Sequence, residues 1–89
     1  MSDMEPTLVA VDLRRHLGEA LGDEEANVIN NAIFCGHPSA AVLGGLSLAS
    51  LRGVSLPPSV LQHIRVDFNW SEDEREELEG YIASLPQAA

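Results

Sequence analysis

The acidic residues of this chain are confined to its two ends. Seven lie between Asp3 and Glu25 and seven between Asp67 and Glu79. From residue 26 to residue 66 there is no acid, and the only arginines are Arg52 and Arg65. A stretch this neutral and apolar must either be covered by the two ends of the chain or be docked on another surface.

The length limits the chain to one domain. Eighty-nine residues form a single acidic helical domain over 1–89, in which we expect residues 1–5 and 86–89 to be frayed. A domain of this size buries roughly 60–65% of the surface that its unfolded chain exposes, so its core is modest. Efficient helix packing, a second copy or a partner must supply the rest of the burial.

The formal net charge is −9, from fourteen acids, five arginines and no lysine. Binding to nucleic acid or to an anionic membrane needs clustered Lys or Arg, so we expect neither direct nucleic-acid nor membrane contact. A protein with a basic surface is the expected partner. Genomic codon bias is the simpler explanation for arginine without lysine.

The first residues lack the basic-then-apolar order of a signal peptide. A single cysteine, Cys35, excludes an internal disulfide, and no apolar run approaches the ~18–20 residues of a membrane span. We therefore expect a cytoplasmic protein.

Apolar spacing and end signals predict three helices in the first part of the chain. The first runs from Pro6 to Gly22. The second begins with Asp23 as its N-cap and ends at Gly36, and the third extends from about residue 38 to Gly53. The third contains Gly44 and Gly45, which either break it or allow another backbone to come close; we favour one continuous helix.

The last part of the chain begins with a short predicted helix from about residue 59. The segment after it has an ambiguous secondary-structure pattern. Ile64, Val66, Phe68 and Trp70 alternate with polar residues, which favours a short extended segment near residues 64–69 that either packs on the bundle or pairs as a strand across a dimer. The pattern leaves open whether residues 62–70 are helix or strand. Ser71 and Glu74 then match a capping box at the start of the last helix. The predicted fold is all-α, a compact four- or five-helix bundle.

Cys35 and His37, whose side chains can act in catalysis or bind a metal ion, lie two residues apart. A structural metal site needs about four ligands, and a Cys–His nucleophile needs an orienting group and an oxyanion hole, none of which the sequence marks. We interpret Cys35 as a small buried hydrophobe and His37 as a loop or N-cap residue. We expect no enzyme activity and no catalytic, cofactor or metal site.

The acids of the last helix have two interpretations. They form a solvated capping face, or they imitate nucleic-acid phosphates and bind a basic cleft through long-range electrostatics. The nearby aromatic residues and arginine either anchor the core or form an interface hot spot. The candidate partner-binding residues are Arg65, Phe68, Trp70, Glu72, Asp73, Glu76, Glu77 and Glu79.

The predicted function is that of a small acidic, non-enzymatic regulator or inhibitor of a larger partner with a basic surface. Nucleases and nucleic-acid-binding complexes are examples of such a partner, and phage inhibitors, antitoxins and immunity proteins are typical of such a chain. The alternative is a structural or assembly subunit that acts through a neutral helix–helix interface over residues 43–51. A homodimer through this neutral middle is compatible with both hypotheses.

Overall fold

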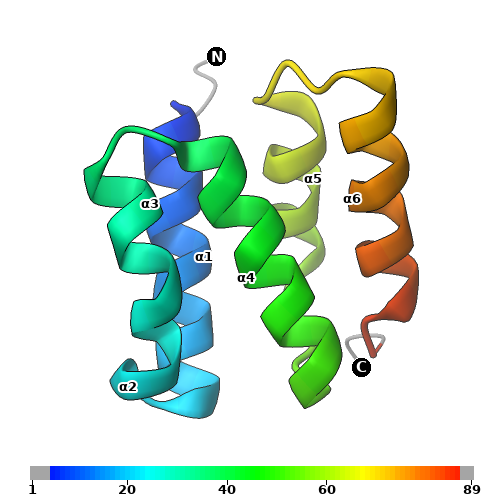
Figure 1. Ribbon diagram of the computed structural model, residues 1–89. Coiled ribbons are helices and arrows are strands. Elements are labelled where there is room, and N and C mark those ends of the chain that lie inside the picture. Colours follow the sequence, from blue (N-terminus) through cyan, green and yellow to red (C-terminus); the bar gives the residue numbers. More distant parts are fainter. Residues whose placement is uncertain (1–4, 87–89) are drawn as a thin grey trace.

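The computed structural model describes residues 5–86, and every regular element among them is helical. The elements are α1 (Pro6–Leu21), α2 (Asp23–Ala26), a 3₁₀ turn η1 (Asn27–Ile29), α3 (Asn30–Phe34), α4 (Pro38–Arg52), α5 (Pro58–Val66) and α6 (Glu72–Ser84). Because α2, η1 and α3 follow one another in a single arm, the described part of the chain forms five helical segments (Figure 1). The all-α bundle is confirmed, and its radius of gyration, 11.9 Å, is close to the about 12 Å of a compact chain of this length.

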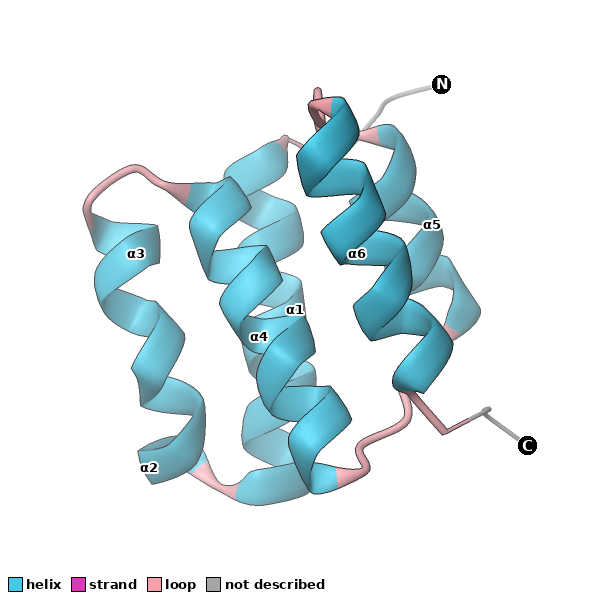
Figure 2. Cartoon of the chain, turned by 45° about the vertical axis from the view of Figure 1, so that its right-hand side comes forward, coloured by secondary structure: helices cyan, strands magenta, loops and turns pink. Residues whose placement is uncertain are grey.

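The helices form two layers. The arm of α2 and α3, then α4, then α6 lie side by side in front, and α1 and α5 lie behind them (Figures 1 and 2). Helix α1 packs mainly against α4 and the arm, and α4 also packs against α3 and α6. Helix α4 is therefore the middle of the front layer, with its inner face on α1.

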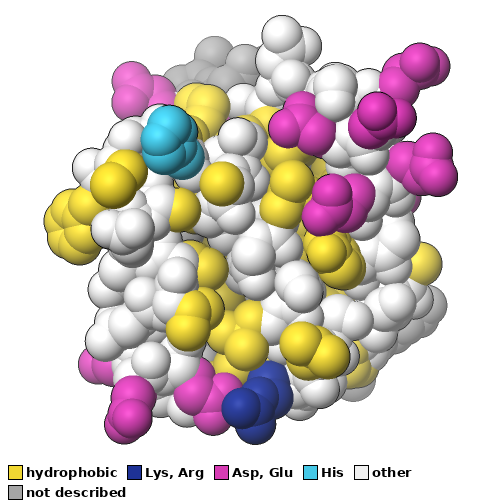
Figure 3. Space-filling view, in the orientation of Figure 1, with side chains coloured by type: hydrophobic (Ala, Val, Ile, Leu, Met, Phe, Trp, Pro, Cys, Tyr) yellow, Lys and Arg dark blue, Asp and Glu magenta, His cyan; other side chains and the backbone are white. Residues whose placement is uncertain are grey.

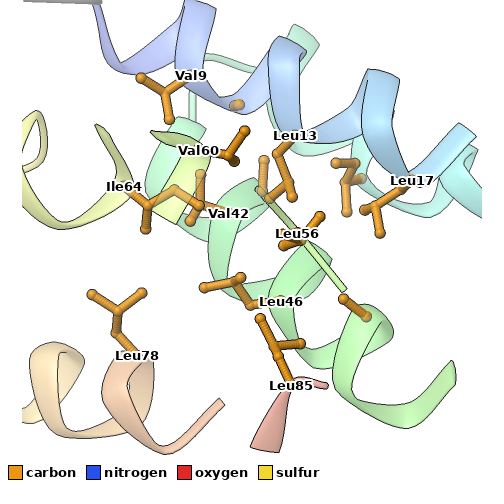
Figure 4. Packing of buried hydrophobic residues seen from close by; sticks show 14 of the residues in the cluster. Val9, Leu13, Leu17, Val42, Leu46, Leu56, Val60, Ile64, Leu78 and Leu85 are labelled. Carbon is orange, nitrogen blue, oxygen red and sulfur yellow. The ribbon is translucent and has the colours of Figure 1, made fainter. Parts of the chain in front are cut away.

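The core lies between these layers and consists mainly of aliphatic side chains, most of them from the helices (Figure 4). Helix periodicity explains it, because the buried positions of α1 recur at steps of three and four residues. The largest fully buried side chains are Val9, Leu13, Leu17, Val42, Leu46, Ile64 and Leu78.

The Gly44–Gly45 pair lies within an unbroken α4, as we favoured. Gly45 is buried where α4 crosses α1, and a β-carbon there would be 2.8 Å from Leu13 Cδ2. Gly44, about 100° around the helix from Gly45, is exposed, and a β-carbon there would be 3.7 Å from Ile29 Cγ2 of η1. The first glycine of the pair thus lies at the border between α4 and the arm, and the second allows α1 and α4 to approach closely.

The second predicted helix differs in two respects from the structure. Asp23 is the first helical residue, and Gly22, with φ 92°, takes the N-cap position. The helix is also interrupted by the 3₁₀ turn at Asn27–Ile29. Arg14 of α1 holds this altered start in place, because its guanidinium donates to the Asp23 carboxylate and to the side-chain oxygens of Asn27 and Asn30 at 3.1, 2.7 and 3.1 Å.

The expected extended segment near residues 64–69 is not present. Residues 64–66 are the last turn of α5, and residues 67–70 form a bend. The buried pair Val60 and Ile64 has helical spacing, and Val66 is 65% exposed, so the alternating residues do not share a buried side. Trp70 closes the bend, because its indole N–H donates to the Ile64 carbonyl at 2.8 Å.

The start of α6 is the predicted capping box. The Glu74 N–H donates to Ser71 Oγ at 3.2 Å, and the Ser71 N–H donates to Glu74 Oε1 at 3.0 Å. Of the termini expected to be frayed, residues 1–4 and 87–89 lie outside the described residues. Glu5 caps α1 through its carbonyl, which accepts from the Val9 N–H at 3.0 Å.

Candidate protein-binding surface

The outer face of α6 carries the main group of free acids. Leu78 and Leu85 anchor the opposite side of this segment in the core, so Glu72, Asp73, Glu76 and Glu77 are exposed. Acidic side chains gather over this part of the molecule in Figure 3. Within residues 5–86, Glu72, Asp73 and Glu76 form no side-chain hydrogen bond or ion pair, so their carboxylates are available to a partner.

Two other predicted acids of α6 have partners within the chain. Glu77 accepts a hydrogen bond from the Tyr81 hydroxyl at 3.1 Å. Glu79 accepts two from the Arg65 guanidinium, at 2.9 and 2.8 Å. The hydrogen bond from Arg65 lowers the pKa of Glu79, and the same contact raises the pKa of Arg65. Arg65 and Glu79 thus neutralise each other and tie α5 to α6.

The acids of the first quarter differ from those of α6, because arginines compensate most of them. The hydrogen bond with Asp12, followed by its charge, raises the pKa of Arg15. The ion pairs on this side are Asp12–Arg15 at 2.6 Å, Glu19–Arg15 at 3.5 Å, Asp23–Arg14 at 3.1 Å and Glu25–Arg52 at 3.2 Å. Arginines thus pair with most described acids of the first quarter, whereas Glu79 alone among the described α6 acids has an ion pair with arginine.

Phe68 and Trp70 lie in the core rather than on the surface. They are 9% and 8% exposed, and their rings stack with centroids 4.8 Å apart. This agrees with the core alternative, and it removes both aromatic side chains from the surface that a partner can reach. Of the predicted partner-binding residues, only acids of α6 thus remain available to a partner.

Cys35 and His37 are both exposed, at the turn between α3 and α4. The interpretation of Cys35 as a buried residue is therefore wrong, because α3 ends at Phe34 and the turn projects from the bundle. Its Sγ lies 3.7 Å from Asn31 Oδ1, and no hydrogen bond joins it to His37 among the described residues. Over the same range, no three His, Cys, Asp or Glu side chains are grouped closely enough to hold a metal ion.

A shallow pocket of about 430 Å³ lies between α5 and α6, near the end of α6. Apolar side chains such as Leu61 and Ile82 form its walls, and Arg65 is its one charged lining residue. Because Arg65 already donates two hydrogen bonds to Glu79, the pocket offers no free charged group to a ligand.

Sequence reasoning missed the ion pairs that separate the two acidic ends. Arg65 and Glu79 are fourteen residues apart, on different helices, and Arg52 reaches Glu25 from α4. No spacing rule within one helix finds such pairs, since these rules cover residues three or four positions apart.

Comparisons of the chain with protein-family models, with curated proteins and with solved structures found no match. None of the helices in residues 5–86 has the length and apolar character needed to cross a membrane. The candidate surface accordingly rests on geometry and charge.

Proposed function

We propose that this protein is a small, non-enzymatic regulator or inhibitor that binds a larger, basic-surfaced partner through the outer face of α6. Nucleases and nucleic-acid-binding complexes are the partner class with the required chemistry. One observation carries the proposal, namely that Glu72, Asp73 and Glu76 are exposed and without partners in the described residues, whereas arginines compensate most acids of the first quarter.

A row of unpaired carboxylates on a rigid helix produces a local negative potential that steers a basic surface toward it. The capping box and the buried Leu78 hold α6 in place, so little ordering is needed when a partner binds. A basic cleft that accepts nucleic-acid phosphates would accept the same row of carboxylates.

The test compares two triple variants of equal charge. One, Glu72→Gln/Asp73→Asn/Glu76→Gln, neutralises the free acids of α6 without breaking any side-chain contact described above. The control, Asp12→Asn/Glu19→Gln/Glu24→Gln, removes three acids from the other end. Each protein and the wild type are immobilised, exposed to lysate of the native host at low and high salt, and the retained proteins are identified by mass spectrometry.

The proposal predicts a basic protein that the wild type and the control retain at low salt, that high salt releases, and that the α6 variant fails to bind. Equal retention by both variants would contradict it. Circular dichroism of the three proteins verifies that the variants keep the helix content of the wild type.

A further inference from the structure

The pocket of about 430 Å³ lies between the start of α5 and the end of α6. These two helices run side by side in opposite directions (Figures 1 and 2), and the hydrogen bonds from Arg65 to Glu79 join them. Half-buried Leu61 and Ile82 form walls of the pocket, and the exposed Ala83 is also part of its lining. The pocket therefore offers apolar surface that solvent can reach.

The pocket and two of the free acids share one side of α6, which we call the α6 strip. It consists of residues at steps of four, three and four, namely Glu72, Glu76, Glu79 and Ala83. Residues at this spacing lie along one face of a helix, and Ala83 is about 10 Å beyond Glu76 along the axis. Because Arg65 neutralises Glu79, the strip has two free carboxylates at its start and an apolar pocket at its end.

The surface around the strip stays negative although it includes a cation. Arg75 is exposed on α6, and no ion pair involves it within residues 5–86. The exposed acids on the same helix that outnumber it are Glu72, Asp73, Glu76 and Glu77. A ligand that carries its own positive charges is therefore attracted to the start of α6.

We propose that the α6 strip binds a basic, amphipathic helix of the protein partner, whose bulky apolar side chain fills the pocket while its arginine or lysine side chains meet Glu72 and Glu76. This inference rests on the proposed function and adds the chemistry of the segment that the partner presents. A shallow pocket does not enclose most of a small ligand, as small-molecule sites do, but it can take one anchoring side chain of a larger interface. Amphipathic helices bind apolar grooves through such anchors.

The experiment measures the binding of two labelled helical peptides to the full chain by fluorescence anisotropy, at low and at high salt. The first peptide carries one tryptophan with arginines seven and eleven positions away on both sides, which matches the spacing of Ala83 from Glu76 and Glu72 in either direction. The second has alanine in place of the tryptophan. We expect the tryptophan peptide to bind about tenfold more tightly and both to bind more weakly at high salt.

Two variants of the chain separate the pocket from the charge. Ala83→Glu adds an acid to the strip but places a carboxylate in the pocket, so the tryptophan peptide should bind about tenfold more weakly despite the added negative charge. Gly80→Glu adds the same charge at an exposed position where a β-carbon meets nothing within 4 Å, and it should not weaken binding. Thermal melts verify that both variants fold.

Three results would overturn the inference. One is equal affinity for the two peptides, or no binding of either; another is tighter binding of the tryptophan peptide to Ala83→Glu than to the wild type, which would leave an interface of charge alone. The third is a dimer of the wild-type chain in sedimentation velocity that Ala83→Glu returns to monomer, which would assign the pocket to a second copy. The proposed function fails on a different result, namely retention of the same basic protein from lysate by the variant with neutralised α6 acids.

Discussion

Gly45 of α4 lies so close to Leu13 of α1 that a β-carbon at position 45 would come within 2.8 Å of Leu13 Cδ2 and 3.3 Å of Leu17 Cδ1. Both leucines are fully buried and surrounded by other core side chains, so neither has free space to move into. This contact sets the spacing of the two helices that form the centre of the bundle.

Substitution of this glycine is therefore expected to destabilise the fold, although alanine is the better helix former. Gly45→Ala gains about 1 kcal/mol in helix propensity and loses about 1–3 kcal/mol through overpacking, so we expect a net loss of up to about 2 kcal/mol in the free energy of unfolding. Urea denaturation measures the difference.

Gly80 of α6 is the matched control, since it lies within a helix and a β-carbon there meets nothing within 4 Å. Gly80→Ala should stabilise the protein by about 0.5–1 kcal/mol. Changes of the same sign at both glycines would contradict the close α1–α4 contact.

Arg14 is expected to hold the arm of α2 and α3 against α1. Its guanidinium donates to Asn30, Asp23 and Asn27, and its side chain is 22% exposed. Arg14→Met removes these hydrogen bonds and keeps most of the apolar stem, so we expect a loss of about 1–2 kcal/mol and faster amide exchange between residues 23 and 34.

Lysine is the informative comparison at this position. Arg14→Lys keeps the charge but not the planar fork that reaches three acceptors, so it should recover little of the lost stability. Full recovery by lysine would show that the charge alone holds the arm.

The sole tryptophan provides a direct test of the core assignment of residues 68 and 70. Trp70 is 8% exposed, stacks on Phe68 and donates to the Ile64 carbonyl. Trp70→Phe keeps an aromatic ring but leaves that carbonyl without its donor and should cost about 1–2 kcal/mol, whereas Trp70→Ala should cost about 3–5 kcal/mol. Urea denaturation followed by circular dichroism measures both, and a negligible cost for Trp70→Ala would contradict the core position.

Local signals in the sequence were sufficient for the helices but not for the contacts between them. Pro6, Gly53 and the Ser71–Glu74 capping box each act within a few residues, so the ends that they mark are visible in the chain. One exception, the Asp23 cap, involves Arg14 of another helix, and the other, the segment near residues 64–69, involves the contact of Trp70 with the Ile64 carbonyl six residues earlier.

The candidate site shows the same limit. The acids of α6 and their exposure followed from the capping box and from the apolar spacing of that helix. The sequence did not show which of these acids remain without a partner, because arginines elsewhere in the chain pair with some of them. The burial of Phe68 and Trp70 was likewise undecided until the bend after α5 was known.

The Arg65–Glu79 pair gives a pH dependence with a definite sign. Its two hydrogen bonds lower the pKa of Glu79 in the folded protein, so the pair stabilises the fold above the unfolded pKa of about 4.3. This contribution is lost as the pH falls through the lowered, folded pKa. Both side chains are more than 40% exposed, so solvent screening limits the contribution to about 0.5–1 kcal/mol.

The measurement is a double-mutant cycle of Arg65→Gln and Glu79→Gln, with free energies of unfolding from urea denaturation at several pH values. The coupling energy should be constant between pH 6 and 8 and should decline toward zero below about pH 4, because protonated Glu79 no longer carries the charge that Arg65 binds. The Glu77→Gln variant is the control, since it removes an acid of α6 that has no arginine partner among the described residues. A coupling energy that stays constant down to pH 2 would show that the pair contributes nothing ionic to the stability of the fold.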